Sequence, residues 1–166
     1  WLIHSVVWFS KRLTAMLGEE KIKKYLHDLH YGNEDISAGI SGAWLVPPDS
    51  TGPALKISAY EQAGFMTALW SGQLPVSPQA MAFTRENTYL EPSPKGSQLN
   101  GKTGSGFYKN DKRTRLGWFI GHVAAGGQEY IVVTNFTDLV PTDGSTYGGV
   151  TARAITKKVL EDQGLW

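Results

Sequence analysis

The spacing of the apolar residues changes near Pro92, and this change limits the possible folds more than any other feature of the sequence. Before Pro92 the apolar residues recur every three or four positions, as on one face of a helix, whereas the runs after it are typical of strands. The expected helices cover residues 5–17, 19–30, 58–71, 77–89 and 151–163, and the expected strands cover 102–108, 116–124 and 128–136. Ser5 and Ser77 are the expected caps of their helices. The sequence therefore predicts an α+β fold, in which a helical region precedes an antiparallel sheet with the C-terminal helix packed on it.

The length of the chain predicts how these elements are organised. We expect residues 1–166 to form a single domain fragment, with a mainly helical part over 1–92 and the strands and C-terminal helix over 99–166. A sheet of three strands leaves its first strand with an open edge unless another segment covers it. The backbone groups of residues 102–108 are therefore expected to be open to a partner.

Charge and composition exclude several classes of function. Sixteen basic and fifteen acidic residues give a net charge of +1, with no Lys/Arg run longer than a pair, so we expect no nucleic acid partner. No apolar run approaches the ~20 residues of a membrane span. The absence of cysteine excludes a disulfide framework and thiolate chemistry. His27 and His30 are three residues apart on one helix, but no third ligand accompanies them, and we expect no metal site.

The stretch from Gly101 to Gly106 contains a lysine, two hydroxyl residues and three glycines, and it admits two interpretations. Residues 96–103 match the phosphate-binding loop of nucleotide-binding proteins. Such a loop joins a buried strand to a helix, whose N-terminus faces the phosphates. Here prolines precede the stretch, and glycines interrupt the first turn of any helix that follows it. Nucleotide binding is therefore a remote alternative.

As an edge strand, the same stretch makes chemical sense. Free N–H and C=O groups on such a strand pair with an extended amide ligand, and Gly104 allows that ligand to approach the backbone closely. Lys102 adds a cation and Thr103 adds a hydroxyl, which together suit an anionic acyl compound. Taken alone, however, the tripeptide Lys-Thr-Gly is more often only a polar, flexible start to a strand.

Three other short motifs accompany Lys102-Thr103-Gly104. They are Ser5-Val6-Val7 at a helix start, Tyr31-Gly32-Asn33 at a helix end and Trp44-Leu45 in a loop. In this order and setting, the four motifs resemble those of the class D (oxacillinase-type) serine β-lactamases. The resemblance continues through 55–65, 117–121 and 154–160, so it covers essentially the whole chain. It implies the fold shared by serine β-lactamases and penicillin-binding transpeptidases.

The resemblance also implies an activity, namely β-lactam hydrolysis through a serine acyl-enzyme intermediate, which gives resistance to β-lactam antibiotics. Ser5 is then expected to pass a proton towards the leaving nitrogen, and Lys102 to supply positive charge near the reacting serine. Thr103 is expected to bind the substrate carboxylate, with Gly104 beside it. The backbone N–H of Ser105 is expected to be one donor of the oxyanion hole.

Four further residues receive expected roles from the same resemblance. Val7, Trp44 and Leu45 are expected to enclose the catalytic base, which in this family is a carboxylated lysine formed with CO2 or bicarbonate. Arg153 is expected to meet the substrate carboxylate, although Ala152 stands where the family's arginine is usually found.

The chain also departs from the family pattern. The family's nucleophile and base come from a Ser-x-x-Lys element, and no serine of this sequence is followed by lysine at the third position. We therefore expect that element on a missing N-terminal segment or a companion chain, and we expect no cofactor beyond the carboxylated lysine. Residues 47–53 form an insertion that is expected to reshape the rim of the pocket. Tyr31-Gly32-Asn33 is expected to be architectural.

The resemblance further implies a periplasmic or secreted bacterial protein with a β-lactam as its substrate. A second interpretation of the same fold is a penicillin-sensing receptor domain, which is acylated but does not turn over. The two differ in whether water releases the acyl group, and the motifs of this chain do not separate them.

Overall fold

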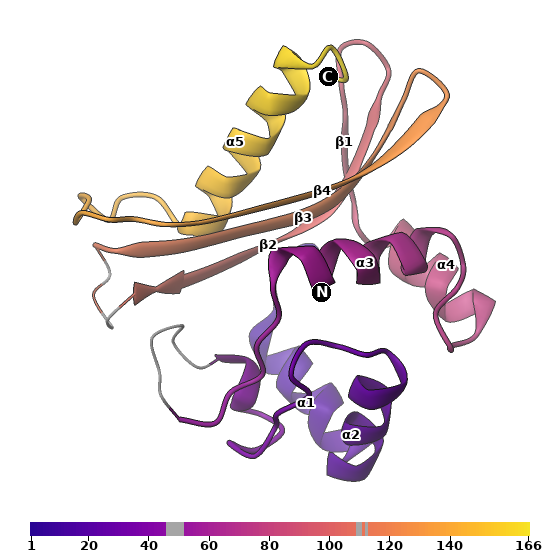
Figure 1. Ribbon diagram of the computed structural model, residues 1–166, viewed down its shortest axis with the longest axis vertical. Coiled ribbons are helices and arrows are strands. Elements are labelled where there is room, and N and C mark those ends of the chain that lie inside the picture. The colour runs from indigo at the N-terminus through magenta and orange to yellow at the C-terminus, as the bar shows by residue number, and fades with distance from the viewer. Residues whose placement is uncertain (46–51, 109–110, 112) are drawn as a thin grey trace.

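The structure, a computed structural model, describes residues 1–45, 52–108, 111 and 113–166. In this part of the chain a four-stranded antiparallel sheet lies between helices on both of its faces (Figure 1). The elements in chain order are α1 (Val7–Leu17), α2 (Glu19–Asp28), a short 3-10 helix η1 (Ala43–Leu45), α3 (Ala59–Trp70), α4 (Pro78–Glu86), β1 (Tyr89–Pro92), β2 (Gln98–Phe107), β3 (Arg115–Ala125), β4 (Gln128–Thr137) and α5 (Gly148–Asp162). The predicted α+β fold is confirmed.

Serine caps begin two of the helices. The Ser58 hydroxyl accepts the N–H of Glu61 at 3.2 Å, and the Glu61 carboxylate accepts the N–H of Ser58 at 2.8 Å, which together form a capping box at α3. Ser77 caps α4 by accepting the N–H of Ala80 at 3.2 Å, as its position before a proline predicts. Both bonds satisfy donors that the first turn of a helix leaves without a partner.

The predicted cap at Ser5 is wrong. The N–H groups of Ser5 and Val6 donate to the carbonyls of Leu2 and Trp1, so these residues form a turn of their own before the helix. Helix α1 begins only at Val7, with no side-chain cap. The hydroxyl of Ser5 is instead directed towards the sheet, where it becomes part of the candidate site.

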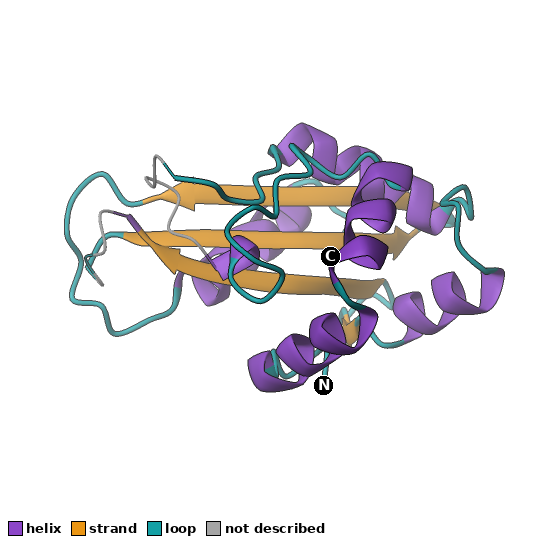
Figure 2. Ribbon diagram, turned by 90° about the horizontal axis from the view of Figure 1, so that it is seen from below, coloured by secondary structure: helices purple, strands orange, loops and turns teal. Residues whose placement is uncertain are grey.

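The sheet has one more strand than the sequence predicts. Helix α4 ends at Glu86 instead of continuing to Tyr89, because Asn87 and Thr88 return hydrogen bonds from their side chains to the carbonyls of Phe83 and Arg85. The following residues form β1, which pairs with residues 98–100 of β2. Figure 2 shows the three long strands side by side and the short β1 beside one end of them. Beyond Asn100, β2 has no second strand partner in the described chain, so the edge predicted to be open at residues 102–108 lacks a neighbouring strand along residues 102–107.

Two apolar layers hold the helices to the sheet. Helix α5 covers one face, and α3 covers the other with α4 packed against α3 (Figure 1). The core under α5 is built on Leu99, Phe119, Val123, Ala152, Leu160 and Trp166, and the core under α3 and α4 on Met66, Leu69 and Met81 with Ile120 and Ile131. Because strand side chains alternate between faces, Phe119 and Ile120 serve opposite layers. The site residues of β2 are divided between the two faces in the same way.

Helices α1 and α2 lie outside these layers, and neither contains a buried residue. The Tyr31-Gly32-Asn33 motif connects them to the segment before α3. The Asn33 side chain donates to the Ala54 carbonyl at 2.9 Å and accepts the N–H of Lys56 at 2.8 Å. Gly32 has a φ of 59°, and a Cβ there would lie 2.0 Å from the Lys56 carbonyl oxygen, so only glycine fits. These bonds are those of an architectural motif. Among the described residues, no helix is long and apolar enough to cross a membrane.

Candidate active site

The backbone of β2 directs alternate residues towards its open edge. The N–H of Gly101 donates to the Thr88 carbonyl at 2.7 Å, on the side of the strand away from β3. Since successive residues of a strand present their backbone groups to opposite sides, Thr103 and Ser105 direct theirs to the same side, past the end of β1. No other strand of the described chain pairs with the N–H groups of Thr103 and Ser105 on this side, and such N–H groups are what an extended acyl ligand requires.

Lys102 and Ser5 meet beside this edge although they are far apart in the sequence. The Lys102 ammonium lies 2.5 Å from the Ser5 hydroxyl oxygen and 2.6 Å from the carbonyl oxygen of Thr103. Burial lowers the pKa of the Lys102 ammonium, because the charged form loses part of its hydration. A lysine in this state gives up a proton more readily than an exposed one. The pair therefore has the composition of a proton relay.

The backbone of Ser5 is unusual. Its φ of 51° lies in the left-handed region, where residues other than glycine are uncommon. Such conformations persist when surrounding contacts determine them, and they gather at functional sites. The conformation of Ser5 is held by the turn before α1 and by the contact with Lys102.

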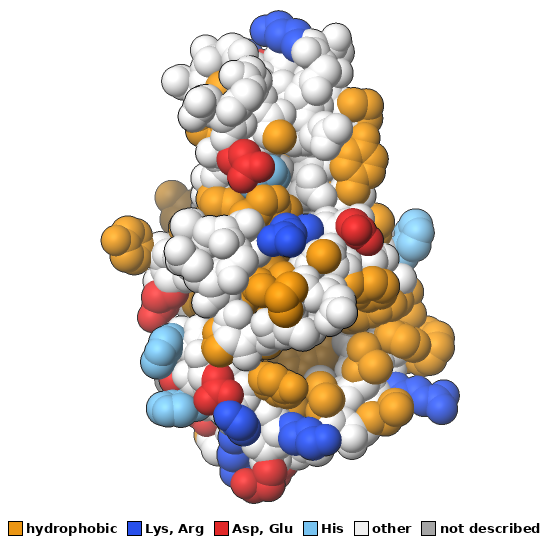
Figure 3. Space-filling view, turned by 90° about the vertical axis from the view of Figure 1, so that its right-hand side faces the viewer, with side chains coloured by type: hydrophobic (Ala, Val, Ile, Leu, Met, Phe, Trp, Pro, Cys, Tyr) orange, Lys and Arg blue, Asp and Glu red, His pale blue; other side chains and the backbone are white. Residues whose placement is uncertain are grey.

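A mainly apolar cavity adjoins Lys102. It has a volume of about 390 Å³ and lies between the N-terminal turn, α2, α3 and the sheet, where Leu2, Tyr31, Gln62, Phe65, Lys102 and Ile120 are among its lining residues. Tyr31 donates its hydroxyl to Gln62 at 3.0 Å, and burial raises the pKa of its phenol, so it remains neutral. A second cavity of about 600 Å³ lies between α2, α3 and α4. Figure 3 shows hydrophobic side chains gathered around a hollow on one side of the molecule.

The three residues predicted to enclose the base are placed as follows. Val7 is the first residue of α1 and is 44% exposed. Trp44 lies on η1, and its indole N–H donates to the Ile40 carbonyl at 3.3 Å. Leu45 ends η1, but its side chain and residues 46–51, which include most of the inserted segment, are outside the described part of the structure. The enclosing role of the three residues remains a prediction.

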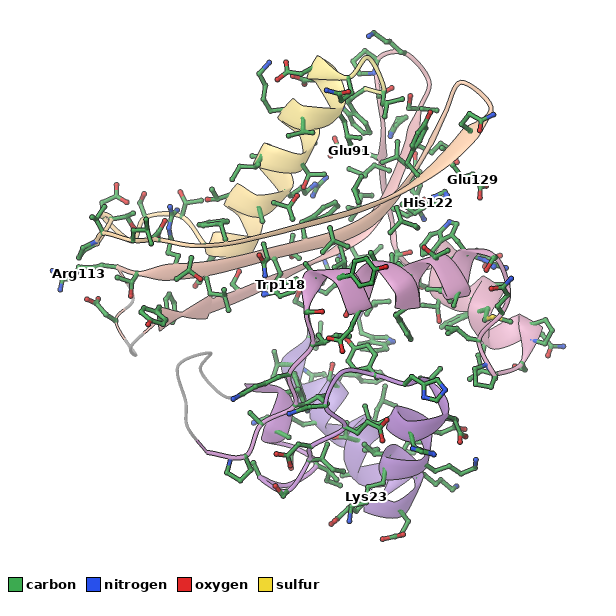
Figure 4. All side chains as sticks on the ribbon, in the orientation of Figure 1. Lys23, Glu91, Arg113, Trp118, His122 and Glu129 are labelled. Atoms are coloured by element: carbon green, nitrogen blue, oxygen red, sulfur yellow. The ribbon has the colours of Figure 1, made fainter. Side chains whose placement is uncertain are left out.

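Arg153 is engaged in an ion pair. Its guanidinium bonds to the carboxylate of Glu91, which Lys157 also approaches at 3.2 Å. Figure 4 shows Glu91 between β1 and α5. The pKa of Glu91 is lowered by its hydrogen bonds to the two cations, although partial burial acts against them. A carboxylate ligand would have to compete with Glu91 for Arg153, whose predicted substrate-binding role remains a prediction.

Sequence reasoning missed a contact on the other face of β2. The hydroxyl of Ser105 accepts the N–H of Gly149, in the first turn of α5, at 2.9 Å. Gly148 and Gly149 were the available signal, because paired glycines at a helix start often mark a close approach to another backbone. Thr103 also faces this helix, since a Cβ on Gly149 would lie 2.9 Å from the Thr103 Cβ.

His122 was also missed. It is 5% exposed and stacks on Trp70 with the ring centroids 4.5 Å apart. Neither of its ring nitrogens has a hydrogen-bond partner among the described residues. The Glu129 carboxylate on β4 lies 3.6 Å from its Nε2 (Figure 4). The available signal was a titratable residue inside an otherwise apolar strand.

The structure disfavours the phosphate-loop alternative, because residues 101–107 continue as strand where a helix would have to begin. Within the described residues, no three side chains of His, Asp or Glu are gathered to hold a metal ion.

Comparisons with known proteins identify the family to which this fold belongs. Residues 1–161 match the family model of the penicillin binding protein transpeptidase domain. The beta-lactamase OXA-1 of Escherichia coli is 38% identical over 144 residues, which are 82% of this chain and 50% of that protein. The structure of the OXA-427 class D beta-lactamase is similar with a TM-score of 0.83 and 32% identity, over 98% of this chain and 68% of that one. The C-terminal domain of the Bacillus licheniformis BlaR penicillin-receptor gives a TM-score of 0.83 and 25% identity, over 98% and 60%.

The chain therefore belongs to the penicillin-binding-protein transpeptidase family. Within that family it is class D serine β-lactamase-like. It spans about half the length of the curated relatives it matches.

Proposed function

We propose that the protein hydrolyses β-lactams through a serine acyl-enzyme, and that this chain supplies the proton-relay and substrate-binding half of the site. The observation that carries the proposal is the 2.5 Å contact between Lys102 and Ser5 beside the open edge of β2. The chain's similarity to proteins named as class D β-lactamases supports the substrate class.

Each residue of the site has a part in this reaction. The β-lactam lies along the edge of β2, where the N–H of Ser105 donates to the carbonyl oxygen as negative charge develops on it. Ser5 passes a proton to the nitrogen that leaves when the amide bond breaks, and Lys102 supplies positive charge and replaces that proton. Thr103 binds the carboxylate of the substrate.

The nucleophile belongs to a segment outside this chain. We assign it to a Ser-x-x-Lys element on an upstream segment or a companion chain, since no serine here has that spacing. The cavity beside Lys102 offers that segment an apolar surface to pack on, and residues 103–107 offer it or the substrate a strand edge that no other strand of the described chain covers. A carboxylated lysine on it would activate the water that releases the acyl group. Such a protein acts outside the cytoplasm, in the periplasm or after secretion.

Steady-state hydrolysis of a chromogenic cephalosporin by the intact protein tests this proposal. We expect sustained product release over many turnovers, and no hydrolysis by residues 1–166 alone, because the nucleophile is absent from them. Activity from residues 1–166 alone would show that the site has been assigned wrongly.

The second candidate function is penicillin sensing, which the similarity to the BlaR penicillin-receptor domain favours. A sensor is acylated once and retains the acyl group. Release of one equivalent of product and no more, with a stable covalent adduct in the mass spectrum, would show that the protein is a sensor and not a hydrolase.

A further inference from the structure

We propose that the side-chain hydroxyl of Ser105 is a positioning group, which fixes the first turn of α5 against the edge strand and thereby holds the backbone N–H of Ser105 in place. This inference rests on the proposed function, in which that N–H faces the reacting carbonyl. It concerns the hydroxyl, which is directed to the α5 face of the strand, whereas Lys102 lies on the other face.

The first observation is that α5 has no cap of its own. The N-cap residue is Tyr147, which makes no side-chain hydrogen bond to the helix. The N–H groups of the first turn have no partner within a helix, and a serine or threonine at the N-cap usually accepts one of them. Here Ser105, from a different element, accepts the N–H of Gly149 at 2.9 Å. The edge strand thus provides the cap that the sequence before α5 lacks.

The second observation is the close approach of the two backbones. A Cβ on Gly149 would lie 2.7 Å from the Gly104 carbonyl oxygen and 2.9 Å from the Ser105 hydroxyl. A Cβ on Gly148 would lie 2.2 Å from the Leu116 carbonyl oxygen. Any side chain at these positions would push the helix away from β2 and β3. The helix start therefore rests directly on the part of β2 that carries the site.

The third observation is a tether on the other side of the helix start. Arg115, on β3, pairs with Asp138 at 2.8 Å and donates to the Thr146 carbonyl and the Thr151 hydroxyl, each at 3.2 Å. The turn before α5 is thereby fixed to the sheet independently of Ser105. Because this end is fixed, the bond from Gly149 restrains Ser105, the more exposed partner.

The consequence concerns the rate of acylation. The Ser105 N–H points to the open edge, and the hydroxyl of the same residue is held by α5. Ser105 therefore connects the helix to the N–H group that is proposed to face the reacting carbonyl. Loss of the hydroxyl leaves the N–H present but less well positioned. A small displacement of a group that stabilises the transition state slows the reaction strongly, whereas it changes ground-state binding along the strand little.

The test compares Ser105→Ala with Ser105→Thr in the intact protein. Single-turnover kinetics with a chromogenic cephalosporin measure acylation, and NMR hydrogen exchange measures protection of the Gly149 amide. We expect Ser105→Ala to slow acylation about 10-fold with little change in the dissociation constant of the noncovalent complex, and to speed exchange of the Gly149 amide about 10-fold. Ser105→Thr, which keeps a hydroxyl, is expected to restore both.

The possible outcomes distinguish failure of the cap or of the positioning role from failure of the proposed function. Unchanged exchange at Gly149 in Ser105→Ala overturns the cap. Faster exchange with unaltered acylation overturns the positioning role and leaves a purely structural bond. A wild-type protein that does not react with β-lactams overturns the proposed function and the positioning role together, and the Gly149 amide still reports on the cap.

Discussion

The burial of His122 makes stability depend on pH in a defined direction. Burial lowers the pKa of the His122 imidazole, and the nearby Glu129 carboxylate only partly opposes this. Among the described residues, Arg85 also lies beside the Trp70 backbone, where its guanidinium donates to the carbonyls of Leu69 and Trp70. Unfolding exposes an imidazole that takes up a proton more readily than the folded one. Lowering the pH through about 6.5 therefore favours the unfolded state, and the stability is fully present only above that value.

The size of this pH effect on stability is limited because unfolding allows His122 to bind at most one proton. A single histidine changes the free energy of unfolding by at most about 1.4 kcal/mol per pH unit, and by at most about that amount between pH 7.5 and 5.5. Replacement by phenylalanine keeps an aromatic ring against Trp70 and removes the titrating group. We expect the intact wild-type protein to lose up to about 1.4 kcal/mol more than His122→Phe over this interval.

Urea unfolding at the two pH values measures this difference. Glu129→Gln is the matched variant, because removal of the carboxylate lowers the pKa of His122 further and so enlarges the loss. Parallel pH dependence in wild type and His122→Phe would refute the reasoning, as would a smaller loss in Glu129→Gln.

Two further predictions concern packing and deacylation. Gly148→Ala places a Cβ 2.2 Å from a backbone oxygen and is expected to lower the free energy of unfolding, by about 1–3 kcal/mol. Gly64→Ala, in the exposed face of α3 with no atom within 4 Å of the new Cβ, is its control. It is expected to stabilise by about 0.5–1 kcal/mol, so equal effects in thermal denaturation would contradict the packing argument. In the intact protein, Trp44→Ala is expected to slow deacylation more than acylation, with partial recovery in added bicarbonate. An absence of any bicarbonate effect would count against a role for Trp44 beside a carboxylated lysine.

Much of the fold follows from local patterns in the sequence. Helix α3 is predictable because the apolar spacing and the Ser58 cap agree, and the strands β2 to β4 because their runs are separated by polar turns. The strand β1 is not predictable in the same way. It is four residues long and is separated from a helix by two residues, and only its pairing with β2 makes it a strand.

The candidate site, like the fold, is only partly predictable from the sequence. Lys102 and Ser5 were identified by motif, and the structure brings them into contact over a separation that no local pattern encodes. The pairing of Arg153 with Glu91 depends on how α5 sits over β1, which is a tertiary property. The cap from Ser105 to Gly149 likewise joins two segments that are unrelated in the sequence.

We propose that Lys102 acts with Ser5 in opening a β-lactam, and steady-state hydrolysis by Lys102→Ala measures this role. The matched control is Lys95→Ala, an exposed lysine in the turn between β1 and β2. In the intact protein we expect kcat/KM for a chromogenic cephalosporin to fall by at least about 100-fold in Lys102→Ala and to stay at the wild-type value in Lys95→Ala. Wild-type turnover in Lys102→Ala would contradict the account.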